Sequence, residues 1–212
     1  MKITLIYDNE LFRAGLQNDW GFSALIEIND RKILFDTGAK GSILINNMEK
    51  LNIKPSSIDD VFISHSHWDH TGGLSHFLKM NKTAKIYIPN SFHFRVKNRE
   101  IIKVEEPLQI HENIFSTGNL KHIEESMVIK IDKGLVIIAG CSHPGVGDII
   151  DSASQFGKPY ALIGGLHGFK QFYILKNLSI ICACHCTIYQ QEIKSLYPEK
   201  WIEGGAGKVI EI

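Results

Sequence analysis

Residues 61–73 read VFISHSHWDHTGG, a short apolar run followed at once by three histidines and an aspartate. The run is partly β-branched and predicts a strand. Because side chains alternate along extended chain, His65 and His67 project to the same side and can reach one ion at about 2.0 to 2.1 Å. Asp69 and His70 follow where the chain turns and could hold a second ion nearby. A solvated histidine-rich loop is the competing interpretation, but the position at a strand end favours a pair of transition-metal ions.

The size and charge of the chain narrow its class. With 212 residues it suits one domain spanning 1–212. Its 23 basic and 23 acidic residues leave no net charge, so neither nucleic acid nor an anionic membrane is favoured as a partner. The first residues do not resemble a signal peptide, and no apolar run has the roughly 18 to 20 residues that span a bilayer. We expect a cytoplasmic protein with a small-molecule substrate, and its oligomeric state stays open.

Strand and helix signals follow one another without a linker or a repeat. The turns Asn29-Asp30 and Asp132-Lys133-Gly134 have the composition of tight hairpins, which predicts mixed rather than wholly parallel sheets. Apolar spacing and turn residues predict helices over 42–51, 146–156 and 188–196. Strands are predicted over 2–7, 22–28, 31–35, 61–64, 85–88, 127–131, 135–139, 161–163, 179–182 and 208–212.

The histidine cluster resembles the shared pattern of the metallo-β-lactamase superfamily, His-x-His-x-Asp-His after a short strand, and matches it in full. Asp36, in LFDTG at 34–38, is similar to the family's strand-ending aspartate, which supports the site from behind the ligands. The set SHSHWDHTGGL, GCSHPGV, GGLH and CHCT looks like the branch that includes dihydropterin-related ribofuranosylaminobenzene phosphate synthases and many hydrolases. The resemblance implies an α/β fold, an αββα sandwich of two mixed β-sheets with helices outside and the metals in a cleft at the sheet edge.

The resemblance also implies a ligand set. His65 and His67 would hold one metal, and Asp69 and His70 the other. His185, within CHCT, resembles the final metal histidine of the family and would complete the second site.

One ligand position departs from the family pattern. Most members take a third histidine from a Gly-His-Thr turn and a bridging aspartate from a later strand end, but here GCSH occupies 140–143. Cys141 ends an apolar run where the bridging aspartate would fall, and a coordinated thiol is deprotonated and can bridge. His143 is the preferred third ligand of the first metal. His122 is the alternative, because it precedes the next strand much as the Gly-His-Thr turn does.

The remaining cysteines and one histidine have weaker assignments. Cys182, Cys184 and Cys186 alternate along a predicted strand and lack the paired spacing of a structural zinc site, so we expect reduced, buried, small apolar side chains. His167, after the glycines of GGLH, would contact substrate or transfer a proton.

These residues indicate the type of reaction more clearly than the identity of the substrate. Two adjacent divalent ions suit hydrolysis of a small, anionic ester, thioester, amide or phosphoester, with Asp69 orienting the attacking water. Zinc is the first choice of metal, and iron and manganese suit the same ligands. Two other functions stay open: a transferase joining a dihydropterin to ribofuranosylaminobenzene 5'-phosphate, and a nonenzymatic metal-binding module.

Overall fold

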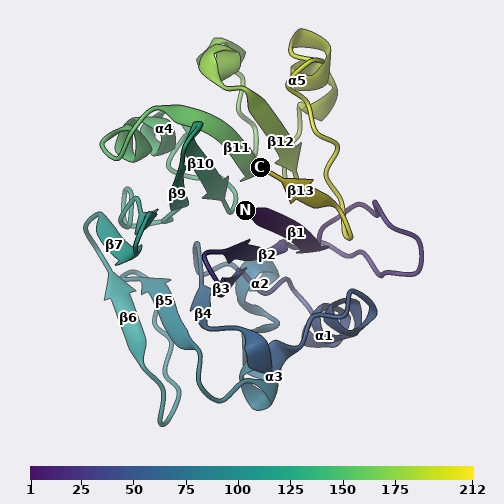
Figure 1. Cartoon of the computed structure of the whole chain (residues 1–212), viewed down its shortest axis with the longest axis vertical. Coiled ribbons are helices and arrows are strands. Elements are labelled where there is room, and N and C mark those ends of the chain that lie inside the picture. Colours follow the sequence, from purple (N-terminus) through teal and green to yellow (C-terminus); the bar gives the residue numbers. More distant parts are fainter.

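Two β-sheets lie face to face, with helices outside both of them (Figure 1). The structure, a computed structural model, describes all residues 1–212. The first sheet has the strand order β13-β1-β2-β3-β4-β5-β6. Its strands are β1 (Lys2–Tyr7), β2 (Ser23–Ile28), β3 (Arg31–Phe35), β4 (Asp60–Phe62), β5 (Lys85–Pro89), β6 (Ile101–Val104) and β13 (Val209–Glu211).

The second sheet has the order β12-β11-β10-β9-β8-β7. Its strands are β7 (Leu108–His111), β8 (Ile114–Ser116), β9 (Met127–Ile131), β10 (Gly134–Ala139), β11 (Pro159–Gly165) and β12 (Ile180–Cys184). Both sheets are mixed, as predicted, because β3 to β6 and β10 to β12 pair in parallel while the other neighbours pair antiparallel.

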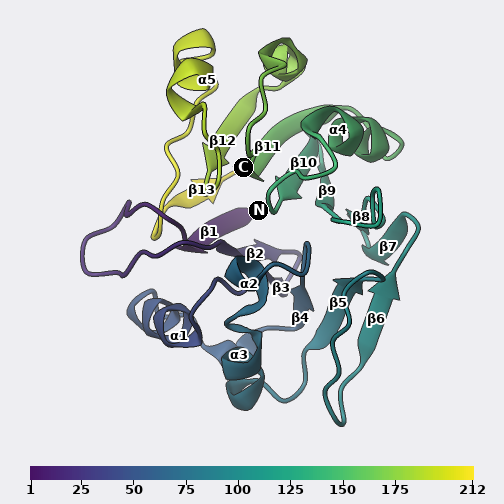
Figure 2. The same ribbon diagram turned by 180° about the vertical axis from the view of Figure 1, so that it is seen from behind.

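The helices cover the outer faces of the two sheets, as the two opposite views show (Figure 2). Helices α1 (Gly41–Lys50) and α3 (Leu74–Met80) pack on the first sheet, and α4 (Val146–Ser154) and α5 (Gln190–Leu196) pack on the second. The short segments are α2 (Trp68–Thr71), η1 (Pro55–Ser57) and η2 (Phe172–Asn177).

Alternation along the strands produces this layering. On β10, Val136 and Ile138 face the other sheet, while Leu135 and Ile137 face the helices. The strands are therefore apolar on both faces, which explains why they appear in the sequence as unbroken apolar runs. Between the sheets the rings of Phe35 and Phe62 stack at 5.3 Å. The αββα sandwich predicted from the resemblance is confirmed.

The predicted elements agree with the structure within two residues at each end, and the predicted strand 161–163 extends over Pro159–Gly165. The strands β6, β7 and β8 were not predicted. They are short, β6 and β7 are edge strands and β8 lies next to β7, and their half-exposed residues weaken the apolar alternation. None of the helices combines the length and the apolar composition needed to cross a bilayer.

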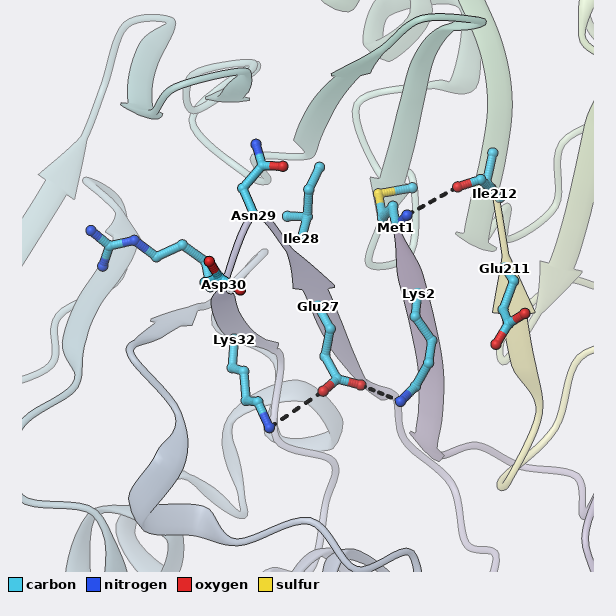
Figure 3. A pocket seen from close by; sticks show the side chains of 10 residues that line it. Met1, Lys2, Glu27, Ile28, Asn29, Asp30, Lys32, Glu211 and Ile212 are labelled. Atoms are coloured by element: carbon cyan, nitrogen blue, oxygen red, sulfur yellow. Dashed lines mark hydrogen bonds and ion pairs between the residues drawn. The ribbon is translucent and has the colours of Figure 1, made fainter.

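The chain termini meet at one end of the first sheet, where Met1 donates to the Ile212 carbonyl and Glu27 pairs with Lys2 and Lys32 (Figure 3). An open hollow of about 760 Å³ lies there, lined by charged side chains. Its lining includes the start of β1 and the turn between β2 and β3. These are the strand ends opposite those that lead to the histidine cluster.

The predicted hairpin turn is present, with both Asn29 and Asp30 in the left-handed region at φ 48° and 60°. The left-handed conformation costs free energy for residues other than glycine, and Asn-Gly is the preferred pair in such turns. Asp30→Gly should therefore raise the free energy of unfolding by roughly 0.5 to 1 kcal/mol, measured by urea denaturation. Asp30→Ala is the control and should lower it. Equal stabilities of the two variants would contradict this account of the turn.

Candidate metal centre

Five strand ends converge on one edge of the sandwich and carry the polar cluster. Asp36 follows β3, and the segment from Ser64 to His70 follows β4. From the second sheet, the loop 140–143 follows β10, His167 follows β11 and His185 follows β12. Residues far apart in sequence therefore meet because the strand ends share one edge.

The first group of donors consists of His65, His67 and His143, whose ligand atoms all lie within 4.8 Å of one another. His65 Nε2 and His67 Nδ1 are 3.1 Å apart. Two nitrogens bound tetrahedrally to one zinc ion at its usual bond length would be about 3.3 Å apart. His143 Nε2 is buried without a hydrogen-bond partner, so its lone pair is available to an ion.

The second group consists of Asp69, His70 and His185. Asp69 Oδ2 lies 3.4 Å from His185 Nε2 and 3.7 Å from His70 Nε2. His185 Nε2 is buried and has no hydrogen-bond partner. The two groups contain the residues that the resemblance assigns to the two metals, together with His143, which was preferred over His122 for the third position of the first metal.

Cys141 lies between the two groups. Its Sγ is 3.2 Å from His70 Nε2, and it belongs to one donor cluster with His65 and His70 and to another with His185 and Cys186. Cys141 therefore lies beside donors of both groups, and its bridging role stays a prediction. His122, the alternative third ligand, lies apart: its side chain is 80% exposed and pairs with Glu105 at 3.1 Å.

A chain of hydrogen bonds orients the imidazoles. Asp36 Oδ2 accepts from Ser64 Oγ at 2.7 Å and from His70 Nδ1 at 2.7 Å. Since Ser64 Oγ donates to Asp36, it accepts from His65 Nδ1 at 2.9 Å. His65 and His70 thus hold their protons on Nδ1 and direct the Nε2 lone pairs into the centre. The supporting role expected of Asp36 agrees with this geometry.

Asn9 does the same for His185. Its Oδ1 accepts from His185 Nδ1 at 3.0 Å, its Nδ2 donates to the His185 carbonyl at 2.9 Å, and Asp8 Oδ2 accepts from the His185 amide at 3.2 Å. Asp8 and Asn9 were not predicted from the sequence. The available signal was their position directly after β1, at the same sheet edge.

Glu124 organises the loop that carries Cys141 and His143. Its fully buried carboxylate accepts from the backbone amides of Gly140, Cys141 and Ser142 at 3.0 Å each, and from that of His143 at 2.9 Å. From the sequence, only His122 of this segment was proposed as a ligand. The available signal was a pair of glutamates, Glu124 and Glu125, between Ile123 and the apolar strand that begins at Met127.

Burial controls the charge states at the centre. Burial and the neighbouring imidazoles hold the pKa of His65 and of His70 well below the usual range, and they lower that of His143 to about 4. Burial would raise the pKa of Asp69, but the close imidazoles of His185 and His70 outweigh that effect and hold its pKa well below the ordinary value. Neutral imidazoles and an ionised carboxylate are the forms that bind metal ions.

Backbone strain gathers at the same strand ends. Asp36, Ser142, His167 and His185 all have left-handed φ values, between 48° and 61°. Such residues cost roughly 1 to 3 kcal/mol each and persist where the surrounding structure imposes them. Here the strain aims ligands and their supports at one point.

The remaining predicted residues lie at the rim or in the core. His167 is exposed, with its ring 5.1 Å from that of His143. Cys182 and Cys184 are buried between the sheets, as expected. Cys186 is also buried, but it lies beyond the end of β12 and faces Cys141 rather than continuing the strand alternation. The prediction that it is simply an apolar filler is therefore incomplete.

Comparison with known proteins agrees with this geometry. Residues 21–149 match the family model of the metallo-beta-lactamase superfamily. The chain belongs to this superfamily. Its members typically bind divalent metal ions and are mostly metal-dependent hydrolases.

Two curated proteins of Methanocaldococcus jannaschii are similar along almost the whole chain. One is 7,8-dihydropterin-6-methyl-4-(beta-D-ribofuranosyl)-aminobenzene-5'-phosphate synthase, at 28% identity with 98% of this chain and 95% of the synthase covered. The other is protein MJ0448, at 26% identity with 99% and 100% covered. The superfamily and branch named by the resemblance are thus confirmed.

Solved structures share the fold. Tm1679, a metal-dependent hydrolase of the beta-lactamase superfamily, superposes with a TM-score of 0.81 at 22% identity over 100% of this chain and 99% of that one. Human short-form tRNase Z superposes with a TM-score of 0.63 at 16% identity over 100% and 99%. At these identities the likeness concerns the fold.

The amide cradle of Glu124 yields a testable prediction. Glu124→Gln places an NH₂ group among backbone donors, which should disorder the loop 140–143 and weaken zinc affinity about tenfold. Zinc affinity would be measured by competition with a chromophoric chelator. Glu125→Gln is the matched control, because Glu125 is equally buried but accepts from Ser116 Oγ, away from the donors. Equal affinities of the two variants would refute the role given to Glu124.

Proposed function

We propose that the protein is a metal-dependent hydrolase with a dinuclear centre, zinc being the first choice, that acts on a small ester, thioester, amide or phosphoester. The observation that carries this proposal is the pair of donor groups, His65-His67-His143 and Asp69-His70-His185, with Cys141 between them. Two divalent ions held there would lower the pKa of bound water and polarise the substrate's oxygen.

The donor set fits such ions. Two buried imidazole nitrogens without hydrogen-bond partners face the cluster, and the Nδ1 protons of His65 and His70 are engaged by Ser64 and Asp36, which leaves their Nε2 lone pairs for a metal ion. Histidine, carboxylate and thiolate together suit zinc, since zinc accepts nitrogen, oxygen and sulfur ligands. Iron and manganese remain compatible with the nitrogen and oxygen ligands.

The protein's own residues contribute orientation and proton transfer. Asp69 faces His70 and His185 with one carboxylate oxygen, which leaves its other oxygen to orient the attacking water. His167 stands at the rim beside His143, where it would pass a proton to the leaving group. We also propose a reducing, cytoplasmic location, because Cys141 and Cys186 would serve the centre only as thiols.

A transferase is the second candidate, favoured by the likeness to the methanogen synthase along nearly the full length of both chains. The same centre would then assist condensation of a dihydropterin with ribofuranosylaminobenzene 5'-phosphate. Product analysis with both substrates present separates condensation from hydrolysis. A protein that binds metal but turns over neither class of substrate would be the metal-binding module.

The metal assignment predicts composition. Protein purified without added metal should contain about two equivalents of zinc, iron or manganese by elemental analysis. His67→Ala and His143→Ala should each lose metal, and hydrolysis of acyl and phosphoryl ester substrates should fall at least about a hundredfold. His122→Ala is the matched control and should keep both. Wild-type protein that stays metal-free after reconstitution would overturn the proposal.

The position of Cys141 predicts a spectroscopic signature. Cobalt-substituted protein should show near-ultraviolet thiolate-to-cobalt charge transfer, since a coordinated thiol is deprotonated. Cys141→Ser should remove that band, whereas Cys182→Ser, a change in the core between the sheets, should leave it in place. A band that survives Cys141→Ser would move the sulfur ligand to Cys186.

A further inference from the structure

A cavity beside the metal centre gathers exposed apolar side chains. Leu11, Phe12, Trp20 and Ile188 are 47%, 47%, 50% and 66% exposed, and all four line a single cavity of about 900 Å³. Scattered apolar residues are normal on a protein surface, but a group of them around one hollow indicates a binding site. The volume suits a small molecule.

The cavity is continuous with the donor cluster. His185, Cys186 and Thr187 form part of its wall, and the ring of Trp20 lies 5.6 Å from that of His185. Asn9 joins the two regions, since its Oδ1 accepts both from His185 Nδ1 and from the amide of Gly21, next to Trp20, at 3.0 Å each. A molecule that rests on Trp20 therefore lies directly beside a proposed ligand of the second metal.

The charges of the lining disfavour an anion in this cavity. No lysine or arginine lines it, whereas Glu10, Asp19 and Glu203 do. Asp19 is paired with Lys40 at 2.6 Å and Glu203 with Lys194 at 2.8 Å. Glu10 has no basic partner, so the cavity keeps an acceptor and a slight negative character. The side chains of Gln190 and Gln191 add free donors and acceptors to the lining.

We propose that this cavity binds an uncharged, planar heteroaromatic ring of the substrate, stacked on Trp20 with its polar edge toward Glu10 and the two glutamines. The proposal rests on the proposed function, because it places the reacting group of the same substrate at the donor cluster. An anionic part of the substrate would then lie at the metal ions. Flat aromatic rings suit such a wall, since stacking adds to the gain from burial.

Binding of unreactive probes tests the proposal without turnover. Isothermal titration of the metal-loaded protein would compare 2-naphthylmethanol with its decahydro analogue. The same titration after chelator treatment would compare 2-naphthylmethanol with 6-hydroxymethyl-2-naphthoate, whose carboxylate then has no metal ion to coordinate. We expect the aromatic alcohol to bind about tenfold tighter than the saturated one and roughly fivefold tighter than the anionic one. Equal or weaker binding of the aromatic alcohol in the first comparison would overturn the aromatic assignment, and in the second comparison it would overturn the uncharged one.

Variants then locate the ring. Trp20→Leu should weaken binding of 2-naphthylmethanol on the order of tenfold, while Trp20→Phe should restore most of it. Tyr173→Leu, which removes an exposed aromatic outside the cavity, should leave it unchanged. Full affinity in Trp20→Leu would refute the site.

The outcome is separable from that of the proposed function. Trp20-dependent ring binding without any hydrolysis would uphold the cavity and reject the hydrolase. Hydrolysis of aryl and alkyl esters at equal rates, unaffected by Trp20→Leu, would uphold the hydrolase and reject the ring-binding cavity.

Discussion

The buried carboxylate of Asp36 is the contact on which the rest of the centre depends. It is fully buried at the end of β3 and accepts from the amide and hydroxyl of Ser64 and from the ring of His70. One side chain thereby ties the end of β3 to the segment after β4 and sets the proton positions of His65, through Ser64, and of His70. Removing it would leave several buried donors unpaired at once, and each such donor costs about 1 to 3 kcal/mol.

The centre buries three carboxyl groups, those of Asp36, Asp69 and Glu124. Burial raises the pKa of Asp36 well above its usual range and that of Glu124 to about 7, which means that burial alone disfavours their ionised forms. Neither carboxylate, nor that of Asp69, is paired with a lysine or arginine. The surrounding imidazoles are neutral, so they supply lone pairs rather than countercharge. Divalent cations satisfy both needs, since they accept the lone pairs and compensate the buried carboxylates. Such binding explains why one edge of an otherwise apolar sandwich can bury so many polar groups.

A shared fold and metal centre leave the reaction class open, because one scaffold supports several chemistries. The comparisons include a hydrolase that shares the fold and a synthase that is similar in sequence over almost its whole length. In this chain the loop from Asp8 to Gly21 lies beside the donor cluster, carries Trp20 and is hydrogen-bonded to His185 through Asn9. The proposed substrate contact and the support of a donor histidine therefore belong to one segment.

The sequence by itself determined the layered fold and most of the donor set. Strands with two apolar faces appear in the sequence as continuous apolar runs. His65 to His70 lie so close in sequence that local geometry alone brings them together. The sequence determined fewer of the contacts between distant residues. Whether His143 or His122 faces His67 depended on the path of the loop 118–124. Glu124, Asp8 and Asn9 had no local sequence pattern that linked them to a metal ligand. The short strands β6, β7 and β8 were missed because half-exposed residues weaken the apolar alternation. Only the tertiary structure decided these points, because hydrogen bonds between separate strand ends depend on how two sheets pack, and the spacing of residues along the chain does not encode that packing locally.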